Sequence, residues 1–182
     1  YVPLNDSETY SVFGKLSFKP TTSIRSSFTY TRNKDTWQNY DHGYKYTPDG
    51  MPTSRKTTNM YALNLNHMLS DKMFYEVKAS YIDTRRGSSV YENPLDPNYV
   101  NDNYSRNDPG FFTGGQSKGY SLVENKDLNL KADLVWQVSE NHTFKTGVQY
   151  ILHELDVQNF NIRNEFFGTG LESESYYDSV TQ

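Results

Sequence analysis

The sequence predicts an all-β fold, an antiparallel meander of about six strands. Three observations predict it: stretches in which apolar and polar residues alternate with period two, short turns that join these stretches in pairs, and long polar segments between the pairs. The predicted strands cover residues of about 10–19, 24–32, 60–69, 73–83, 125–138 and 143–153.

The first predicted hairpin spans residues 10–32. Its first strand has Val12, Leu16 and Phe18 at even positions, whereas most odd positions are polar. A short turn at residues 20–22 contains a proline, and the alternation then resumes through residues 24–32. One face of this hairpin is therefore apolar and the other is polar, which is typical of a half-buried sheet.

The second and third hairpins repeat this pattern around the short turns at residues 70–72 and 139–142. Beyond Leu152, the apolar positions change phase to Leu155 and Val157. A change of phase of this kind predicts a β-bulge or the end of the membrane-spanning strand.

The pairs are joined by two long polar segments, at about residues 33–58 and 84–124, which contain several glycines and prolines and are predicted to be loops. Connections in compact soluble domains are mostly short. Alternation of short and long connections is typical of outer-membrane β-barrels, which have short periplasmic turns and long extracellular loops.

The aromatic residues give a second indication of a membrane. The chain is only 35% hydrophobic but contains 16 Tyr and 10 Phe. On the apolar face these rings fall near the two strand ends, and six steps from Tyr75 to Tyr81 span roughly 20 Å, close to the apolar band of about 25 Å in such barrels. The predicted membrane-interface residues are Tyr10, Tyr30, Tyr61 and Tyr81 at the outer end and Phe18, Tyr75, Trp136 and Phe144 at the inner end.

Six strands are too few to close a barrel in lipid, because an open edge leaves backbone groups unpaired in hydrocarbon. The smallest single-chain barrels have about eight strands. We therefore expect residues 1–182 to form part of a larger transmembrane β-barrel in the bacterial outer membrane, in contact with its lipid.

The face opposite the apolar one is expected to line the lumen. Its charged residues are of mixed sign and would either tune an open pore or bond a plug inside the barrel, and we favour the plug. These predicted lumen-facing residues are Lys15, Arg25, Glu76, Lys78, Lys131, Asp133 and Lys145.

Aromatic residues also crowd the two predicted loops. Together with Asn, Asp and Arg they suit a ligand surface, since they offer large apolar areas with polar groups attached. In the alternative interpretation these rings pack the loops against each other. The candidate ligand-binding residues are Trp37, Tyr40, Tyr44, Tyr46, Tyr99, Tyr104, Phe111 and Phe112.

No catalytic, metal or cofactor site is predicted. The chain has no Cys, and its four His residues do not fall at a metal-binding spacing. The segment 96–103 is rich in oxygen ligands but lacks the glycine and the terminal Glu of an EF-hand loop. A net charge of −4 without a long basic run argues against a nucleic-acid partner.

Residues 61–87, YALNLNHMLSDKMFYEVKASYIDTRRG, contain a His before a short turn that contains Ser, then Phe-Tyr-Glu and an alternating strand. Residues 142–165 form a second such stretch, HTFKTGVQYILHELDVQNFNIRNE, which also alternates. Both stretches resemble barrel hairpins of TonB-dependent receptors, of the Bacteroidetes type that carries an N-terminal carboxypeptidase-regulatory-like domain.

The resemblance implies a barrel of about 22 strands around a plug, energy coupling through TonB, and uptake of a nutrient such as a siderophore, glycan or peptide. A surface lipoprotein is a further partner that it implies. The sequence itself contains no recognisable plug or TonB box, so energy coupling rests on the resemblance alone. A passive porin, a structural barrel and a secreted soluble β-domain with a binding role remain as alternatives.

Overall fold

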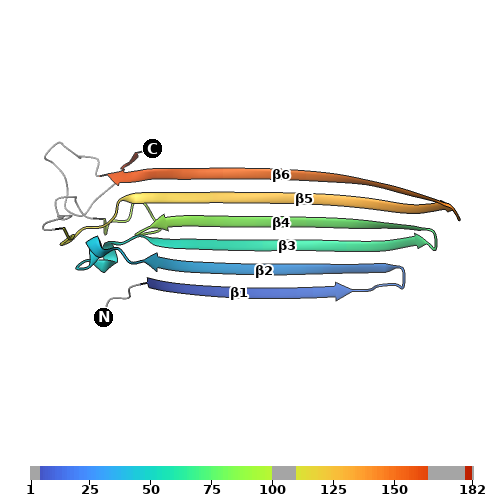
Figure 1. The fold of residues 1–182 in the computed structure, drawn as a ribbon, viewed down its shortest axis with the longest axis horizontal. Helices are drawn as coiled ribbons and strands as arrows, with labels where there is room; N and C mark the ends of the chain where they lie inside the picture. The colour runs from blue at the N-terminus through green and yellow to red at the C-terminus, as the bar shows by residue number, and fades with distance from the viewer. Residues whose placement is uncertain (1–4, 100–109, 164–178, 182) are drawn as a thin grey trace.

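The computed structural model describes residues 5–99, 110–163 and 179–181, and these form one open antiparallel sheet in the order β1-β2-β3-β4-β5-β6-β7 (Figure 1). The predicted all-β class and the meander of six long strands are confirmed. The strands are β1 (Asn5–Phe18), β2 (Ile24–Asn39), β3 (Thr53–Ser70), β4 (Met73–Ser89), β5 (Gly119–Ser139), β6 (His142–Arg163) and the short β7 (Ser179–Thr181). Two single-turn 3₁₀ helices, η1 (His42–Tyr44) and η2 (Pro48–Gly50), lie between β2 and β3.

The connections alternate in length, as predicted. The links within the hairpins β1–β2, β3–β4 and β5–β6 cover only residues 19–23, 71–72 and 140–141. The links between hairpins cover residues 40–52 and 90–118, and their described parts, 40–52, 90–99 and 110–118, lie together at the opposite end of the sheet (Figure 1). We call the two ends of the sheet the turn end and the loop end.

The predicted strand ends were wrong at the loop end. The predicted loops 33–58 and 84–124 shrink to residues 40–52 and 90–118, because β2, β3, β4 and β5 all continue into them. β6 reaches Arg163 instead of ending near residue 153. In the extensions of β2, β3 and β4 both faces are largely polar, so the hydrophobic alternation disappears there while the backbone ladder continues. The extensions of β5 and β6 still carry apolar residues, among them Leu122, Leu155 and Val157.

Of the two predictions for the change of phase after Leu152, the β-bulge was wrong. β5 and β6 pair without interruption from the pair of Leu128 with Leu152 to the pair of Gly119 with Asn161. The register shifts of this sheet lie instead beside the short turns, between Met68 and Ser70 and between Gln137 and Ser139. Because β6 alternates unbroken, Leu155 lies on the opposite face from Leu152.

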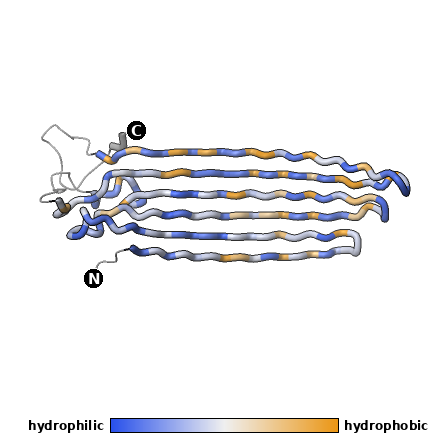
Figure 2. The backbone as a smooth tube through the Cα atoms, in the orientation of Figure 1, coloured by the Kyte–Doolittle hydropathy of each residue, from blue (hydrophilic) through white to orange (hydrophobic). Residues whose placement is uncertain are grey.

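The register assigns every strand residue to one of two faces, and hydropathy alternates along the strands accordingly (Figure 2). The band face is the one that carries Val12, Phe28, Leu63, Val77, Leu130 and Val148. The polar face is the other, and it carries Lys15, Thr29, Asn64, Lys78, Asn129 and Gln149.

The sheet is a single layer, so most of its apolar side chains are not buried. On the band face, Leu63 is 46% exposed and Val148 is 68% exposed. The buried hydrophobic residues gather at the loop end, where Val90, Tyr99, Tyr120, Leu122 and Ile162 form a small cluster. Among the described residues, no helix has the length and apolar character needed to cross a membrane.

Candidate functional site

A row of tyrosines crosses the band face. Tyr30, Tyr61 and Tyr81 lie directly opposite one another on β2, β3 and β4. Their ring centroids are 5.1 Å apart between Tyr30 and Tyr61 and 6.3 Å apart between Tyr61 and Tyr81. Leu128 and Leu152 continue the same row on β5 and β6. We call this line the tyrosine row.

A second set of aromatic residues lies near the turn end of the band face. Tyr75 is opposite His67, its hydroxyl lies 3.1 Å from His67 Nδ1, and the rings meet edge to face at 5.2 Å. Trp136 is opposite Phe144 on the next hairpin. Between these rings and the tyrosine row, the band face is lined mainly with Leu, Val, Ala and Phe, and Tyr150 lies among them on β6.

The remaining two predicted interface residues are both on β1. Phe18 lies opposite Ser26, within the turn half of the sheet. Tyr10 lies opposite Lys34, whereas Gly14 is the β1 residue opposite Tyr30. Tyr10 is therefore four residues beyond the tyrosine row along its strand, and it does not belong to the row.

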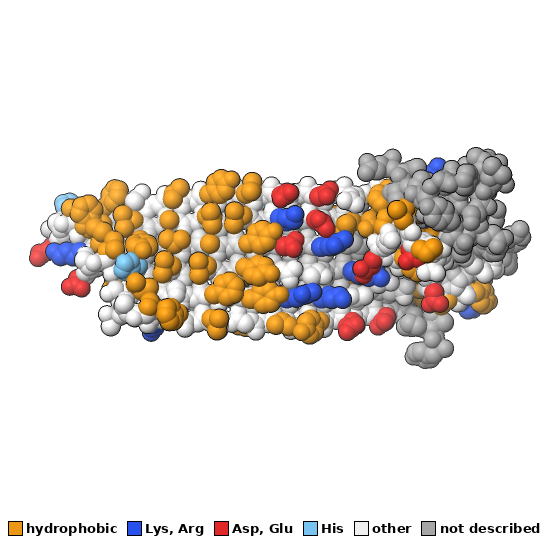
Figure 3. Space-filling model, turned by 180° about the vertical axis from the view of Figure 1, so that it is seen from behind, with side chains coloured by type: hydrophobic (Ala, Val, Ile, Leu, Met, Phe, Trp, Pro, Cys, Tyr) orange, Lys and Arg blue, Asp and Glu red, His pale blue; other side chains and the backbone are white. Residues whose placement is uncertain are grey.

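The band face changes abruptly from apolar to charged beyond the tyrosine row (Figure 3). In the next residues towards the loop end, nearly every strand presents a charged side chain, and these side chains form a charged belt. Arg85 Nε lies 3.3 Å from Glu124 Oε1, and Arg55 Nε lies 3.2 Å from Oε1 of the loop residue Glu92. The charged belt comprises Glu8, Arg32, Lys34, Arg55, Asp83, Arg85, Glu124, Lys126, Glu154 and Asp156.

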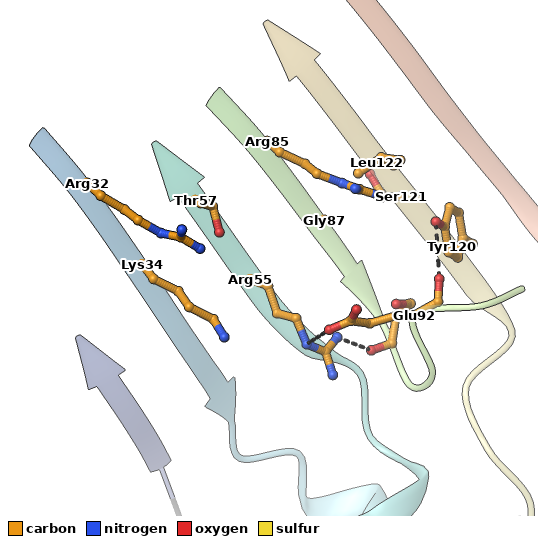
Figure 4. Close-up of a pocket in the computed structure, with 11 residues that line it drawn as sticks. Arg32, Lys34, Arg55, Thr57, Arg85, Gly87, Glu92, Tyr120, Ser121 and Leu122 are labelled. Carbon is orange, nitrogen blue, oxygen red and sulfur yellow. Dashed lines mark hydrogen bonds and ion pairs between the residues drawn. The ribbon is translucent and has the colours of Figure 1, made fainter. Parts of the chain in front are cut away.

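The middle of the charged belt contains a hollow of about 240 Å³ (Figure 4). Four cationic side chains from three adjacent strands line it, namely Arg32, Lys34, Arg55 and Arg85. Sequence reasoning missed this site. These residues are far apart in the chain, and each lies in or beside a segment predicted to be a loop.

The predicted lumen-facing residues do share one face, and it is the polar face. The register places Arg25, Glu76 and Asp133 in one row and pairs Lys78 with Lys131. Ion pairs form along single strands, with Lys78 Nζ 2.8 Å from Glu76 Oε2 and Lys131 Nζ 3.0 Å from Asp133 Oδ2. Lys15 and Lys145 complete the set.

The loop aromatics pack mainly against one another. Tyr44 stacks at a tilt on Phe112 with centroids 4.5 Å apart, and His42 meets Phe111 edge to face at 5.1 Å. The backbone joins the same segments, since Phe112 N donates to Gly43 O at 2.7 Å. These contacts agree with the alternative interpretation, in which the rings hold the loops together.

Other rings of this group have different surroundings. Tyr46 lies 5.5 Å from Phe111 but stays 64% exposed. The Tyr40 hydroxyl lies 2.7 Å from His42 Nδ1. Tyr46 is therefore the exposed member of this ring cluster, and Tyr40 joins the cluster through its contact with His42.

Two predictions for the candidate ligand-binding residues were wrong: Trp37 was expected in a loop, and Tyr99 was expected on an exposed ligand surface. Trp37 belongs to β2, where the Arg86 guanidinium lies 5.9 Å from its ring centroid, so it is not a loop residue. Tyr99 is fully buried, and its ring meets Tyr91 edge to face at 4.9 Å, so its ring is a core element at the loop end. Tyr104 lies outside the described residues.

The packing at the loop end perturbs two phenols. Burial raises the pKa of Tyr44 above the ordinary tyrosine value, and a hydrogen bond with Ser117 opposes part of this effect. Burial also raises the pKa of Tyr99, against an opposing hydrogen bond from the Tyr91 backbone. Both side chains therefore stay neutral at physiological pH and serve the packing of the loops.

No family model matches the chain, and no match was found among curated proteins or solved structures. Within residues 5–99, 110–163 and 179–181, no three His, Asp or Glu side chains gather in a way that could hold a metal ion. Function must therefore be argued from the two faces of the sheet and from its loop end.

Proposed function

We propose that this sheet is a sector of the wall of an outer-membrane β-barrel, and that the barrel belongs to a TonB-dependent receptor that imports a nutrient. The band face would meet lipid, the polar face would meet the lumen and its plug, and the loop end would lie outside the cell. Further strands would close the barrel, because both edges of a sheet must be paired in hydrocarbon.

One observation carries the proposal: the exposed band face is mainly apolar between the tyrosine row and the aromatic residues of the turn end, and it becomes mainly charged directly beyond the row. From Tyr61 to His67 the six steps measure roughly 20 Å, and from Tyr81 to Met73 the eight steps measure roughly 26 Å. An apolar band of about 25 Å between two aromatic girdles is characteristic of outer-membrane barrels. A soluble sheet would cover Leu63 and Val148 with a second layer.

The strand lengths fit the same proposal. A membrane-crossing β-strand needs only about 9–11 residues, whereas β5 has 21 residues and β6 has 22. The surplus lies beyond the tyrosine row, towards the loop end. In the proposed barrel these extensions stand above the membrane and support the packed loops.

The transport function rests on the resemblance of residues 61–87 and 142–165 to hairpins of TonB-dependent receptors. The polar face suits a plugged barrel, since Glu76 and Asp133 are already paired with lysines and the surrounding Ser, Thr and Asn side chains offer many hydrogen-bonding groups. Tyr40, Tyr46 and the rings around them supply an aromatic surface for a ligand at the loop end.

Spin labelling tests the membrane part of the proposal. The chain has no Cys, so Val77→Cys and Lys78→Cys can each carry a single nitroxide in a cysteine-free background of the full-length protein in its membrane. We expect oxygen to relax the label at position 77 and a water-soluble nickel complex to relax the label at 78. Asp83→Cys, on the band face beyond the tyrosine row, should respond to nickel.

Equal nickel accessibility at positions 77 and 78 would contradict the membrane orientation. Transport is tested separately, by comparing nutrient uptake in host cells with and without a functional TonB. Uptake that persists without TonB would favour a passive porin, even if the spin labels support the orientation.

A further inference from the structure

The hollow in the charged belt has a defined arrangement of donors. Lys34, Thr57 and Arg85 lie in one cross-strand row on β2, β3 and β4, and Arg55 lies two residues from Thr57 on the same strand. The side chains of Arg32 and Lys34 extend from β2 towards β3, and the Arg32 guanidinium lies beside Thr57 (Figure 4). Thr57 and the four cationic residues line one hollow, which is a donor-rich setting for an oxyanion.

The cations of the hollow are only partly neutralised. Arg55 pairs with Glu92 and Arg85 pairs with Glu124, but neither Arg32 nor Lys34 has an ion pair among the residues that the structure describes. Like charges held close together on one face of a sheet destabilise it. An anion bound between β2 and β3 would remove this repulsion.

The floor of the hollow is kept open by a glycine. Gly87 lies opposite both Arg55 and Leu122 on the band face. A Cβ atom at position 87 would come within 3.2 Å of Ser121 O and 3.5 Å of Leu122 Cδ1. Any larger residue at this position would fill space between the arginines.

The place of the hollow on the sheet indicates where the anion comes from. Arg32 lies two residues beyond Tyr30 on β2, which is roughly 7 Å, and both side chains are on the band face. Tyrosines prefer the membrane–water interface, so in the proposed barrel the hollow lies at the level of the lipid headgroups. Phe28 and Leu63 continue from the same place down the apolar band.

We propose that this hollow binds the phosphate group of a membrane lipid whose acyl chains lie along the apolar band. Arginine suits this role because its guanidinium can donate two hydrogen bonds to one phosphate. Acidic residues flank the hollow, with Glu8 on β1 and Asp156 on β6, so the site is confined to β2–β4. The inference rests on the proposed function, because it requires the band face to meet lipid.

Native mass spectrometry tests the proposal with phosphatidic acid as the probe. The full-length protein is placed in phosphatidylcholine nanodiscs that contain a small fraction of phosphatidic acid, and the retained lipid is counted after release. We expect the wild type to retain phosphatidic acid and the double variant Arg32→Gln/Lys34→Gln to retain at least about tenfold less, since each cation near a membrane surface attracts an anionic lipid.

The double variant Lys56→Gln/Arg86→Gln is the matched control. Lys56 and Arg86 are paired on the polar face of β3 and β4, at the same level of the sheet as the hollow. This variant therefore removes the same positive charge as the first double variant, but from the opposite face. This control should retain phosphatidic acid as the wild type does. Gly87→Val, which changes no charge, should reduce retention by filling the hollow.

Equal retention by both double variants would overturn the proposal. So would displacement of phosphatidic acid by inorganic phosphate at an equal concentration, because that result would identify a site for free phosphate. The spin labels at positions 77 and 78 report separately on the proposed function. Lipid contact at position 77 without a difference between the double variants would remove only the lipid site.

Discussion

The ring of Tyr30 lies 5.1 Å from the ring of Tyr61, centroid to centroid, and the two residues are directly paired between β2 and β3. With Tyr81 they form the line at which the band face changes from apolar to charged. The same kind of substitution on the band face should therefore have different effects on the two sides of the tyrosine row, that is, towards the turn end and towards the loop end.

Tyr61 is the central ring of the tyrosine row, and Tyr61→Leu removes both of its ring contacts. We expect this substitution to lower the free energy of unfolding by about 1–3 kcal/mol, since each aromatic pair contributes about 0.5–1.5 kcal/mol beyond its buried area. Tyr61→Phe keeps the rings and should cost less. Urea titration of the full-length protein in lipid vesicles measures both. Equal losses for Leu and Phe would assign the effect to the hydroxyl.

Val77 tests the interior of the apolar band. Val77→Arg should destabilise the protein by roughly 2–4 kcal/mol, because a cation near the middle of a bilayer is costly on the lipid face of a barrel. Ser80→Arg, three residues along β4 on the polar face, should cost much less. The same lipid-refolding titration compares them. Similar costs at the two positions would mean that the faces are wrongly assigned.

Gly50 tests the packing of the two loops. A Cβ atom at position 50 would lie 2.5 Å from Gly115 O and 2.9 Å from Thr47 Oγ1. Gly50→Ala should therefore separate the loops, with a cost of about 1–3 kcal/mol as for other overpacked sites. The measurement is hydrogen exchange at the Ser117 amide, which donates to Gly50 O at 2.8 Å. Gly119→Ala, whose Cβ has only a 3.9 Å contact, should leave this exchange unchanged.

The raised pKa values of Tyr44 and Tyr99 predict how the loop end responds to alkali. A phenol whose pKa is higher in the folded state than its unfolded value of about 10 stabilises the fold fully below that unfolded value. This contribution is lost as the pH rises through the higher, folded pKa. We therefore expect loop protection to fall at a pH above that at which free tyrosine ionises.

Tyrosinate absorbance provides the measurement for this alkaline transition. In the wild type, the part of the absorbance rise that occurs at the highest pH should accompany the loss of hydrogen-exchange protection in residues 40–52 and 110–118. Tyr44→Phe and Tyr99→Phe should each remove some of that part of the rise. An absorbance curve that both substitutions leave unchanged would show that other phenols titrate in this range.

Much of the fold follows from local patterns in the chain. Alternation in residues 10–18, 24–32 and 60–69 predicts both the strands and their apolar positions, because in an extended chain successive side chains point to opposite faces. The short turns predict that neighbouring strands are antiparallel and paired. These features need only a few consecutive residues, and the structure has all of them.

The site at the loop end could not be predicted in the same way. In β2 and β3 neither face is apolar beyond the tyrosine row, so no hydrophobic alternation in residues 33–39 or 53–59 marks them as strands. The backbone nevertheless continues its hydrogen-bonded ladder there, because each added pair of residues joins an existing register. Trp37 was for this reason predicted to lie in a loop when it belongs to β2.

The sequence by itself determined the two faces of the sheet and the alternation of short and long connections, since both depend on neighbours along the chain. Only the tertiary structure decided which distant residues meet. Register brings Lys34, Thr57 and Arg85 into one row, and loop packing brings Tyr44 to Phe112. The cationic hollow and the buried Tyr99 depend on pairing between strands and loops, which no local pattern records.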